Sequence, residues 1–166
     1  MAKYQMRGLE EYARYLQEIG ANTPEICGEV VYAMADVVAN AVRKNLSSLP
    51  TVTEAQAKAT YRAKKTAELT SAQKKGLEKG FGISPMRNDN GYWNVKLGFD
   101  GYNNVKTRKY PKGQPNVMIA RAVESGSSAR QKRPFIRPAV NATRKLAIEK
   151  AKIVIDKKIY AIKGGK

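Results

Sequence analysis

The sequence contains no histidine and a single cysteine, Cys27. These scarcities exclude nucleophilic systems that need a histidine base, ordinary zinc sites and an internal disulfide. A lone thiol suits a reducing compartment such as the cytoplasm, and its place in a helical apolar pattern predicts a buried small side chain. Acidic residues are sparse and scattered, and no glycine-rich phosphate loop followed by Lys and Ser or Thr occurs. The sequence therefore indicates a protein that is not an enzyme and that carries no metal or cofactor.

Long apolar runs are also missing, and none approaches the roughly 20 residues that cross a bilayer. The first residues, MAKYQMRGLEEYARYL, include acids and lack an apolar signal core, which predicts that the chain is not exported. The chain has 166 residues, of which 42% are apolar and 27% charged. This composition predicts one globular domain, residues 1–166, without a membrane partner.

Positive charge is in large excess, because 31 Lys and Arg against 14 Asp and Glu give a net charge of +17. The excess is uneven: residues 1–50 hold 5 cations and 6 acids, whereas residues 100–137 hold 9 cations and 2 acids. Such a field attracts nucleic acid or an acidic protein surface, and salt screens it. The charge alone does not choose between these partners, and any individual cation can equally be a solvated position on a helix face.

The first part of the chain predicts two helices and an exposed connection. Apolar residues three and four apart predict a short helix over 8–19, which Gly20 should end. Thr23 and Pro24 supply an N-cap and a first-turn proline for a second helix, which should end within 45–49. Residues 51–75 are poor in large apolar groups, so we expect a basic exposed excursion, either an arm that orders against a neighbouring subunit or DNA, or a loose loop. Its candidate cations are Lys58, Arg62, Lys64 and Lys65.

The second part predicts a small sheet followed by a helix. Residues 80–84 and 117–123 have the composition of short strands, and 92–99 alternates apolar and polar side chains like one strand. Asn90-Gly91 before it has hairpin turn chemistry. From Pro134 onward, apolar residues at helical spacing, Val140 among them, predict a long helix. The expected fold is α+β: two N-terminal helices, a small antiparallel sheet and a long C-terminal helix packed on it.

The stretch between the last predicted strand and the terminal helix holds a candidate protein interface. Glu124 stands among cations, which predicts an ion pair. Pro134 and Phe135 suit a strand-to-helix junction with Phe135 as its apolar plug. The same stretch is also suited to facing another subunit, because arginine and aromatic residues are frequent at interfaces. The candidate interface residues are Arg121, Glu124, Arg130, Lys132, Arg133, Phe135 and Arg137.

A second candidate surface lies in residues 100–116, a connection rich in Gly, Pro and Asn that mixes cations with Tyr110. Such a mixture can bind phosphates and stack on bases, so a basic nucleic-acid-binding module is the alternative function. The purely structural interpretation anchors Tyr110 in the fold and leaves the cations in water. A toxin-type ribonuclease, acting through Arg, Lys, Tyr and Glu, is the one enzyme class left open. The loop cations are Lys106, Arg108, Lys109 and Lys112.

Two motifs in the second half of the chain carry a family resemblance. Val123-Glu124-Ser-Gly126, followed by Pro134-Phe-Ile-Arg-Pro138-Ala, resembles the signature of a bacteriophage tail-component family. These are the neck or tail-completion proteins that sit between the capsid portal and the tail tube. The opening MRGLEEY and the stretch VVANAVRKNL are similar to parts of the family's first two helices. The chain departs from the family at Ser125, where an aromatic residue is usual, and in its enlarged connection over 51–75.

The resemblance implies a structural virion protein that joins the head to the tail and completes the tail. It implies closed rings around the DNA channel, six-fold or twelve-fold, in which one face of each subunit contacts a different face of the next. The implied partners are further copies of the chain, portal or connector, tail terminator or tail-tube proteins, and transiently the genomic DNA. The implied location is the neck of the virion, after assembly in the host cytoplasm.

Overall fold

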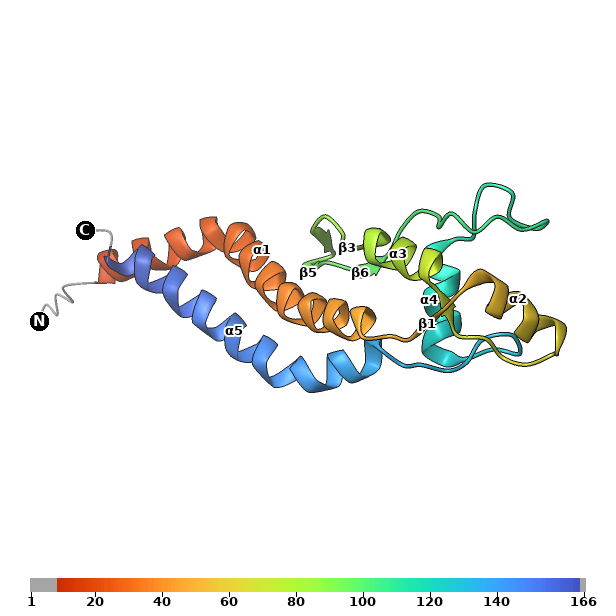
Figure 1. Ribbon diagram of the computed structural model, residues 1–166. Helices are drawn as coiled ribbons and strands as arrows, with labels where there is room; N and C mark the ends of the chain where they lie inside the picture. Colours follow the sequence, from red (N-terminus) through yellow and green to blue (C-terminus); the bar gives the residue numbers. More distant parts are fainter. Residues whose placement is uncertain (1–8, 165–166) are drawn as a thin grey trace, which may run out of the picture.

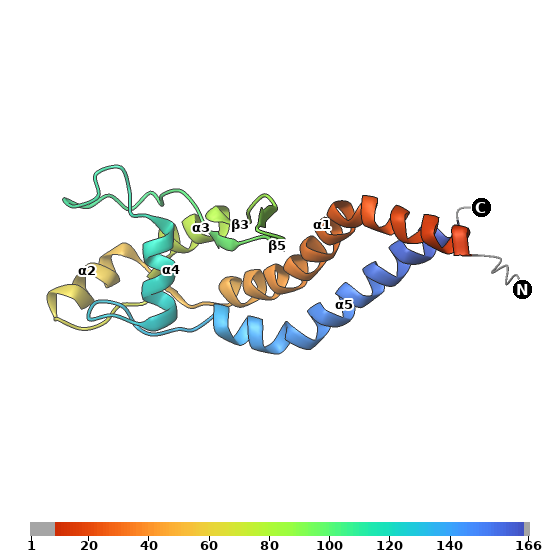
Figure 2. The same cartoon turned by 180° about the vertical axis from the view of Figure 1, so that it is seen from behind.

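The computed structural model describes residues 9–164, which form an elongated molecule of five helices and short strands (Figure 1). Two long helices, α1 (Leu9–Ser47) and α5 (Ile136–Gly164), run antiparallel to each other. The other elements gather beside the second half of α1 and the start of α5, so the described chain begins and ends at the opposite tip (Figures 1 and 2).

A single helix, α1, stands where the sequence predicts two, so that prediction is wrong. Pro24 lies inside α1, where proline removes one helical hydrogen bond. Thr23 Oγ1 donates to the Ile19 carbonyl over 2.9 Å and Asn22 Nδ2 to the Glu18 carbonyl over 2.8 Å. Thr23 therefore bonds back to the preceding turn instead of capping a new helix. The helix bends where its colour passes from red to orange in Figure 2, as proline causes helices to do.

The chain after α1 folds into short elements, so the exposed excursion predicted over 51–75 is only partly correct. Residues 58–66 lie mostly at the surface, but Leu69, Gln73 and Leu77 are buried. Two helices begin at capping boxes, in which a threonine and the glutamine three residues later bond each other's backbone. The elements are β1 (Thr51–Val52), α2 (Glu54–Arg62), β2 (Leu69–Thr70), which pairs in parallel with β1, and α3 (Ser71–Gly80).

Two antiparallel strand pairs follow. β3 (Phe81–Ile83) pairs with β6 (Leu97–Phe99), and β4 (Arg87–Asp89) pairs with β5 (Tyr92–Asn94). The turn between β4 and β5 uses positive φ angles of 53° at Asn90 and 91° at Gly91, so the predicted hairpin chemistry is confirmed. The predicted single strand over 92–99 is wrong, because its two halves pair with different strands.

Helix α4 (Asn116–Ser125) occupies the segment where a strand was predicted over 117–123. Its buried residues include Asn116, Ile119, Ala120 and Val123, which follow the spacing of one helix face. A short, nearly continuous apolar run fits a buried strand and a buried helix equally well. The strand prediction is wrong because it relied on such a run.

The hydrophobic core lies where α1, α3, α4, β3 and the start of α5 meet. Phe135, 1% exposed, packs its ring 5.9 Å from that of Phe99, which lies 5.0 Å from that of Phe81. The mixed helix-and-sheet class is confirmed, but α5 packs along α1 and not on a sheet. Val140 is exposed, while Ala139 on the neighbouring position is buried. Within residues 9–164, no helix is both long and apolar enough to cross a membrane.

Candidate functional site

Glu124 sits at the end of α4 and caps the first turn of α5. Its carboxylate accepts hydrogen bonds from the backbone N–H groups of Phe135 at 2.8 Å, Ile136 at 2.9 Å and Arg137 at 3.0 Å. These N–H groups have no partner within the helix, and the helix dipole favours an anion there. The two sequence motifs therefore meet in one structural unit, with Glu124 as the link. The prediction of an ion pair for Glu124 is wrong: within residues 9–164 its carboxylate forms none, and its oxygens accept hydrogen bonds from backbone N–H groups instead.

The electrostatics of Glu124 follow from this arrangement. Burial raises the pKa of the carboxyl group, since the side chain is 9% exposed. The three backbone hydrogen bonds and the charge of Arg137 together outweigh burial and hold the pKa of Glu124 below its ordinary value. The carboxylate is thus ionised at neutral pH and stabilises the start of α5.

Two arginines tie the stretch between α4 and α5 to Glu68 and to the first turn of α3. Arg130, 6% exposed, donates to the Glu68 carbonyl and, over 2.9 Å, to Gln73 Oε1, and burial lowers the pKa of its guanidinium. Arg133 Nη2 lies 2.6 Å from Glu68 Oε1, and the hydrogen bond to Glu68 raises the pKa of Arg133. The sequence did not indicate Glu68 or Gln73 as partners, because they lie more than fifty residues away along the chain.

The predicted interface residues divide into two groups. Glu124, Arg130 and Phe135 are buried and hold the fold together, so they do not form a surface for a partner. Arg133 is exposed but paired with Glu68. The remaining residues of the set are solvent-exposed: Arg121, Lys132 and Arg137.

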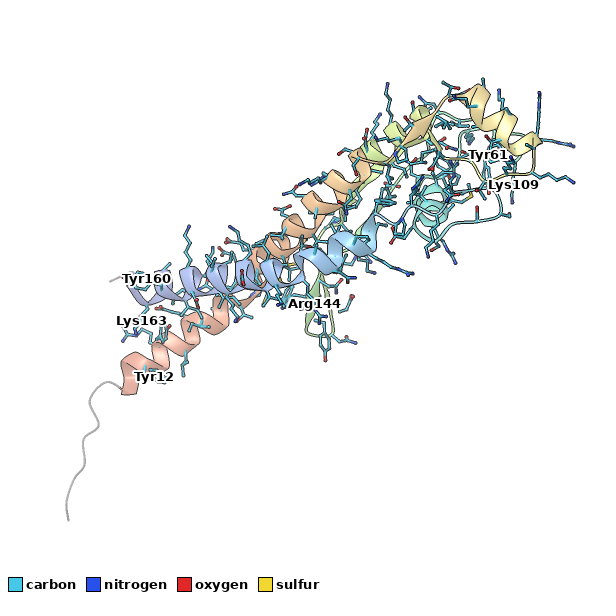
Figure 3. The ribbon with its side chains drawn as sticks, turned by 60° about the horizontal axis from the view of Figure 1, so that its bottom comes forward. Tyr12, Tyr61, Lys109, Arg144, Tyr160 and Lys163 are labelled. Carbon is cyan, nitrogen blue, oxygen red and sulfur yellow. The ribbon has the colours of Figure 1, made fainter. Side chains whose placement is uncertain are left out.

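The second predicted set comes together at one end of the molecule. The end of α2 and the loop before α4 lie at the tip opposite the chain termini, and Tyr61 and Lys109 mark this tip in Figure 3. Residues 51–66 and 101–115 carry eight cations and one acid, Glu54. We call the eight exposed cations the basic tip: Lys58, Arg62, Lys64, Lys65, Lys106, Arg108, Lys109 and Lys112.

Local structure holds both segments of the basic tip. Lys64, at φ 55°, turns the chain after α2, and its N–H donates to the Tyr61 carbonyl over 3.0 Å. In the loop, Thr107 and Tyr110 exchange two backbone hydrogen bonds of 3.1 and 3.0 Å. The Tyr110 hydroxyl donates to Met118 Sδ over 3.2 Å, which ties the loop to α4. The structural interpretation of Tyr110 as a loop anchor is therefore correct, and the basic tip is a surface held by the fold.

A polar hollow of about 700 Å³ lies beside α3 and was not predicted. Asn116 and Asn103, 2% and 3% exposed, lie along it, and Asn116 Nδ2 donates to the Asp100 carbonyl over 2.8 Å. A Cβ atom at Gly80 would come within 2.6 Å of Asn116 Nδ2, so glycine allows α3 to approach this closely. Asn103 and Asn116 belong to no recognisable motif, so this packing had no signal in the sequence.

The opposite end of the molecule is a pair of helices, which we call the arm: residues 9–30 of α1 and 146–164 of α5. Lys158 on α5 forms ion pairs with two acids on α1, Glu29 and Glu25, the latter over 2.9 Å. The hydrogen bonds to these two acids raise the pKa of Lys158. The remainder of the described chain, residues 31–145, is called the body. Large apolar side chains of the arm stay in solvent: Tyr12, Leu16, Leu146, Ile153 and Tyr160.

Comparisons with known proteins give no relative: no family model, no curated protein and no solved structure matches the chain significantly.

Proposed function

We propose that the chain is a non-enzymatic structural subunit of a bacteriophage neck, which assembles into a ring and joins the head to the tail. In this proposal the ring, six-fold or twelve-fold, contacts portal or connector proteins on one side and tail terminator or tail-tube proteins on the other. The protein would reside in the virion after assembly in the host cytoplasm. Its work is docking through surfaces.

One observation carries the proposal: a single elongated molecule presents two different surfaces at opposite ends. The basic tip lies at one end, and the arm with its exposed apolar side chains lies at the other (Figures 1 and 3). A subunit that connects different neighbours needs two such separated and chemically distinct surfaces. The basic tip suits acidic partner surfaces, and its charge would speed docking, while apolar contacts would hold the joint.

The two motifs that resemble the tail-component family give further support. Glu124 of the first motif binds the backbone of Phe135, Ile136 and Arg137 in the second motif. Residues that recur together in a family are expected to depend on each other physically, and here one carboxylate connects them. The resemblance and the geometry thus select the same residues.

The test is a phage particle assembled without this chain. We expect DNA-filled heads and free tails to accumulate separately, and we expect the purified chain to restore joined particles when it is added to them. Electron microscopy of the lysate measures both outcomes. Normal joined particles in the absence of the chain would overturn the proposal.

The basic tip favours nucleic-acid binding as a second candidate function. Segments about forty residues apart in the sequence bring their cations to one end of the molecule, and Lys109 Nζ lies 5.6 Å from the centre of the Tyr110 ring. Lysine and arginine that neutralise phosphates make binding fall steeply with salt. A monomer that binds DNA with a steep salt dependence, lost on Lys64→Glu/Lys65→Glu, would favour this candidate; salt-independent or absent binding would remove it.

A further inference from the structure

The outer face of α5 carries an apolar ridge that the fold leaves in solvent. Leu146, Ile153 and Tyr160 are 55%, 61% and 76% exposed. They are seven residues apart, and seven residues make nearly two helical turns, so the three side chains lie along one line. The buried residues Ala147 and Ala151 of the same helix face α1 instead. The ridge supplies one apolar position in every seven residues, where a coiled-coil seam has two.

Opposite charges flank this ridge. Glu149 and Asp156 lie on one side of Ile153, and Lys150 and Lys157 lie on the other, because residues three and four positions away fall on either side of a helical line. All four side chains are exposed, and neither acid forms an ion pair within residues 9–164. We call these pairs the acidic flank and the lysine flank.

The lysine flank borders a hollow between α5 and α1. This hollow has a volume of about 490 Å³, and Ile153, Val154 and Ala161 supply its apolar lining. Lys150, Lys157 and the ion pair of Lys158 with Glu29 complete the lining. The lining thus mixes apolar side chains with lysines and one acid; Lys150 and Lys157 form no ion pair within residues 9–164 and can face carboxylates of a neighbouring helix.

We propose that α5 binds α5 of a second copy of this chain, parallel and in register, through the ridge and its two flanks. In a parallel pair, the acidic flank of each helix meets the lysine flank of the other, so Glu149 faces Lys150 and Asp156 faces Lys157 across both seams. In an antiparallel pair, like flanks meet, and acids would face acids. Such a pair uses the ridge and both flanks of each copy, so it closes at two copies, and a ring of six or twelve copies needs a second, different contact between pairs.

Charge complementarity within one chain identifies the occupant as another copy. A partner for the ridge must present apolar side chains seven residues apart, with acids on one side of them and lysines on the other. The α5 helix of a second copy presents all three features in this order. The inference rests on the proposed assembly of several copies and names one contact within it. An acidic protein of other composition is the competing occupant.

The first experiment reverses each flank in the full chain and measures the molar mass by sedimentation over a range of concentrations. Glu149→Lys/Asp156→Lys and Lys150→Glu/Lys157→Glu should each weaken self-association by at least about tenfold. They change the net charge in opposite directions, so general repulsion cannot explain both losses. An equimolar mixture of the two variants should associate again. The matched control is Lys64→Glu/Lys65→Glu in the basic tip, which changes the charge as much as the lysine-flank variant and should leave association unchanged.

The second experiment tests the orientation by disulfide formation in a Cys27→Ala background. Tyr160→Cys should form a symmetric disulfide with Tyr160→Cys of a second copy, because equivalent residues lie side by side in a parallel pair. A mixture of Leu146→Cys and Tyr160→Cys chains should give few mixed disulfides. The exposed control Val117→Cys, on α4, should form disulfide-linked dimers much more slowly than Tyr160→Cys.

The outcomes separate this inference from the proposed function. A wild-type chain that stays monomeric to about 100 μM, or flank variants that associate like wild type, overturns the inference. Preferred disulfides between positions 146 and 160 overturn the parallel orientation and with it the proposal. Self-association through α5 together with normal head-to-tail joining in particles that lack the chain would leave the inference standing and remove the neck function.

Discussion

The body and the arm solve the problem of burying apolar surface in different ways. In the body, Val42, Leu46, Leu77, Val123 and Phe135 are at most 1% exposed and come from three helices, α1, α3 and α4, and the segment just before α5. In the arm, few residues are buried, Ile26 at 9% exposed among them, and Ile153 and Tyr160 remain in solvent. The body therefore completes its core within one chain, whereas the arm leaves a seam that a neighbour can close.

The polar groups follow the same division. In the body, Glu124 and Arg130 are buried and bonded to backbone and side chains of distant segments. In the arm, Glu149 and Asp156 are exposed and form no ion pair within residues 9–164. Residues of a recognisable sequence motif can thus be buried within the fold, whereas a helix face without any motif can remain exposed to a partner.

The sharpest contrast should come from two apolar truncations. Phe135→Ala should lower the free energy of unfolding by about 3–5 kcal/mol, because it empties a site in the packed aromatic cluster. Ile153→Ala should change the unfolding free energy of the monomer by no more than about 0.5 kcal/mol, since its side chain is exposed. Urea denaturation at low protein concentration measures both values. Equal losses would show that the arm is packed as tightly as the body.

The next largest effect should come from the cap of α5. Glu124→Gln should cost about 1–3 kcal/mol, because a neutral amide replaces the carboxylate that accepts three backbone hydrogen bonds. The matched control is Glu149→Gln on the exposed face of α5, which should cost about 0.5 kcal/mol or less. Urea titrations of the three proteins at pH 7 provide the comparison. An unchanged free energy of unfolding for Glu124→Gln would contradict the role of Glu124 as the cap of α5.

The same carboxyl group should give the body an acid-dependent stability. The pKa of Glu124 is lower in the folded chain than in the unfolded one, because the three backbone hydrogen bonds and Arg137 together outweigh the effect of burial. Its contribution is therefore fully present above the unfolded pKa and is lost as the pH falls through the folded pKa. Unfolding free energies measured from pH 7 downward should converge for wild type and Glu124→Gln at the acid end. Parallel curves would show that another group carries the effect.

A smaller effect should follow from Pro24, where the arm begins to bend. Pro24→Ala should raise the unfolding free energy by about 1 kcal/mol, because alanine restores a helical N–H and removes a steric clash. The gain stays below the full cost of proline in a straight helix, since the bend and the side-chain bonds of Thr23 and Asn22 already relieve part of it. Thermal unfolding followed by circular dichroism checks this, and a loss of stability would show that the bend is required for packing.

The smallest stability effect should occur at the basic tip. Lys64→Glu/Lys65→Glu should change the unfolding free energy by no more than about 0.5 kcal/mol, because both side chains are in water. Any DNA binding by the chain should weaken, with a salt slope reduced by about 1–2. Fluorescence titrations at several salt concentrations measure the slope. A large stability loss would mean that the tip is part of the body's packing.

Local signals in the sequence predicted the elements whose causes are local. Asn90-Gly91 predicted the hairpin because its φ angles suit that dipeptide, and the apolar period after Pro134 predicted α5. The starts of α2 and α3 could also have been predicted, because threonine followed three residues later by glutamine marks a capping box at Thr53 and at Thr70.

Elements that depend on distant contacts could not be predicted in the same way. Pro24 with Thr23 reads locally as a helix start, but packing along α5 keeps α1 continuous. The roles of Glu124 and Arg130 depend on backbone groups that only the folded chain brings to them. The exposed ridge was missed because its residues look like part of one apolar helix pattern, and the packing partner decides which of them face solvent.

The central claim is that the body buries its hydrophobic core within one chain, whereas the apolar ridge of the arm is buried only against a second copy. Sedimentation equilibrium of the full chain and of Ile153→Asp, combined with their unfolding curves at low concentration, tests it most directly. We expect the wild type to associate with rising concentration and Ile153→Asp to remain monomeric with an unchanged unfolding free energy. Equal molar masses for the two proteins at every concentration would contradict the account.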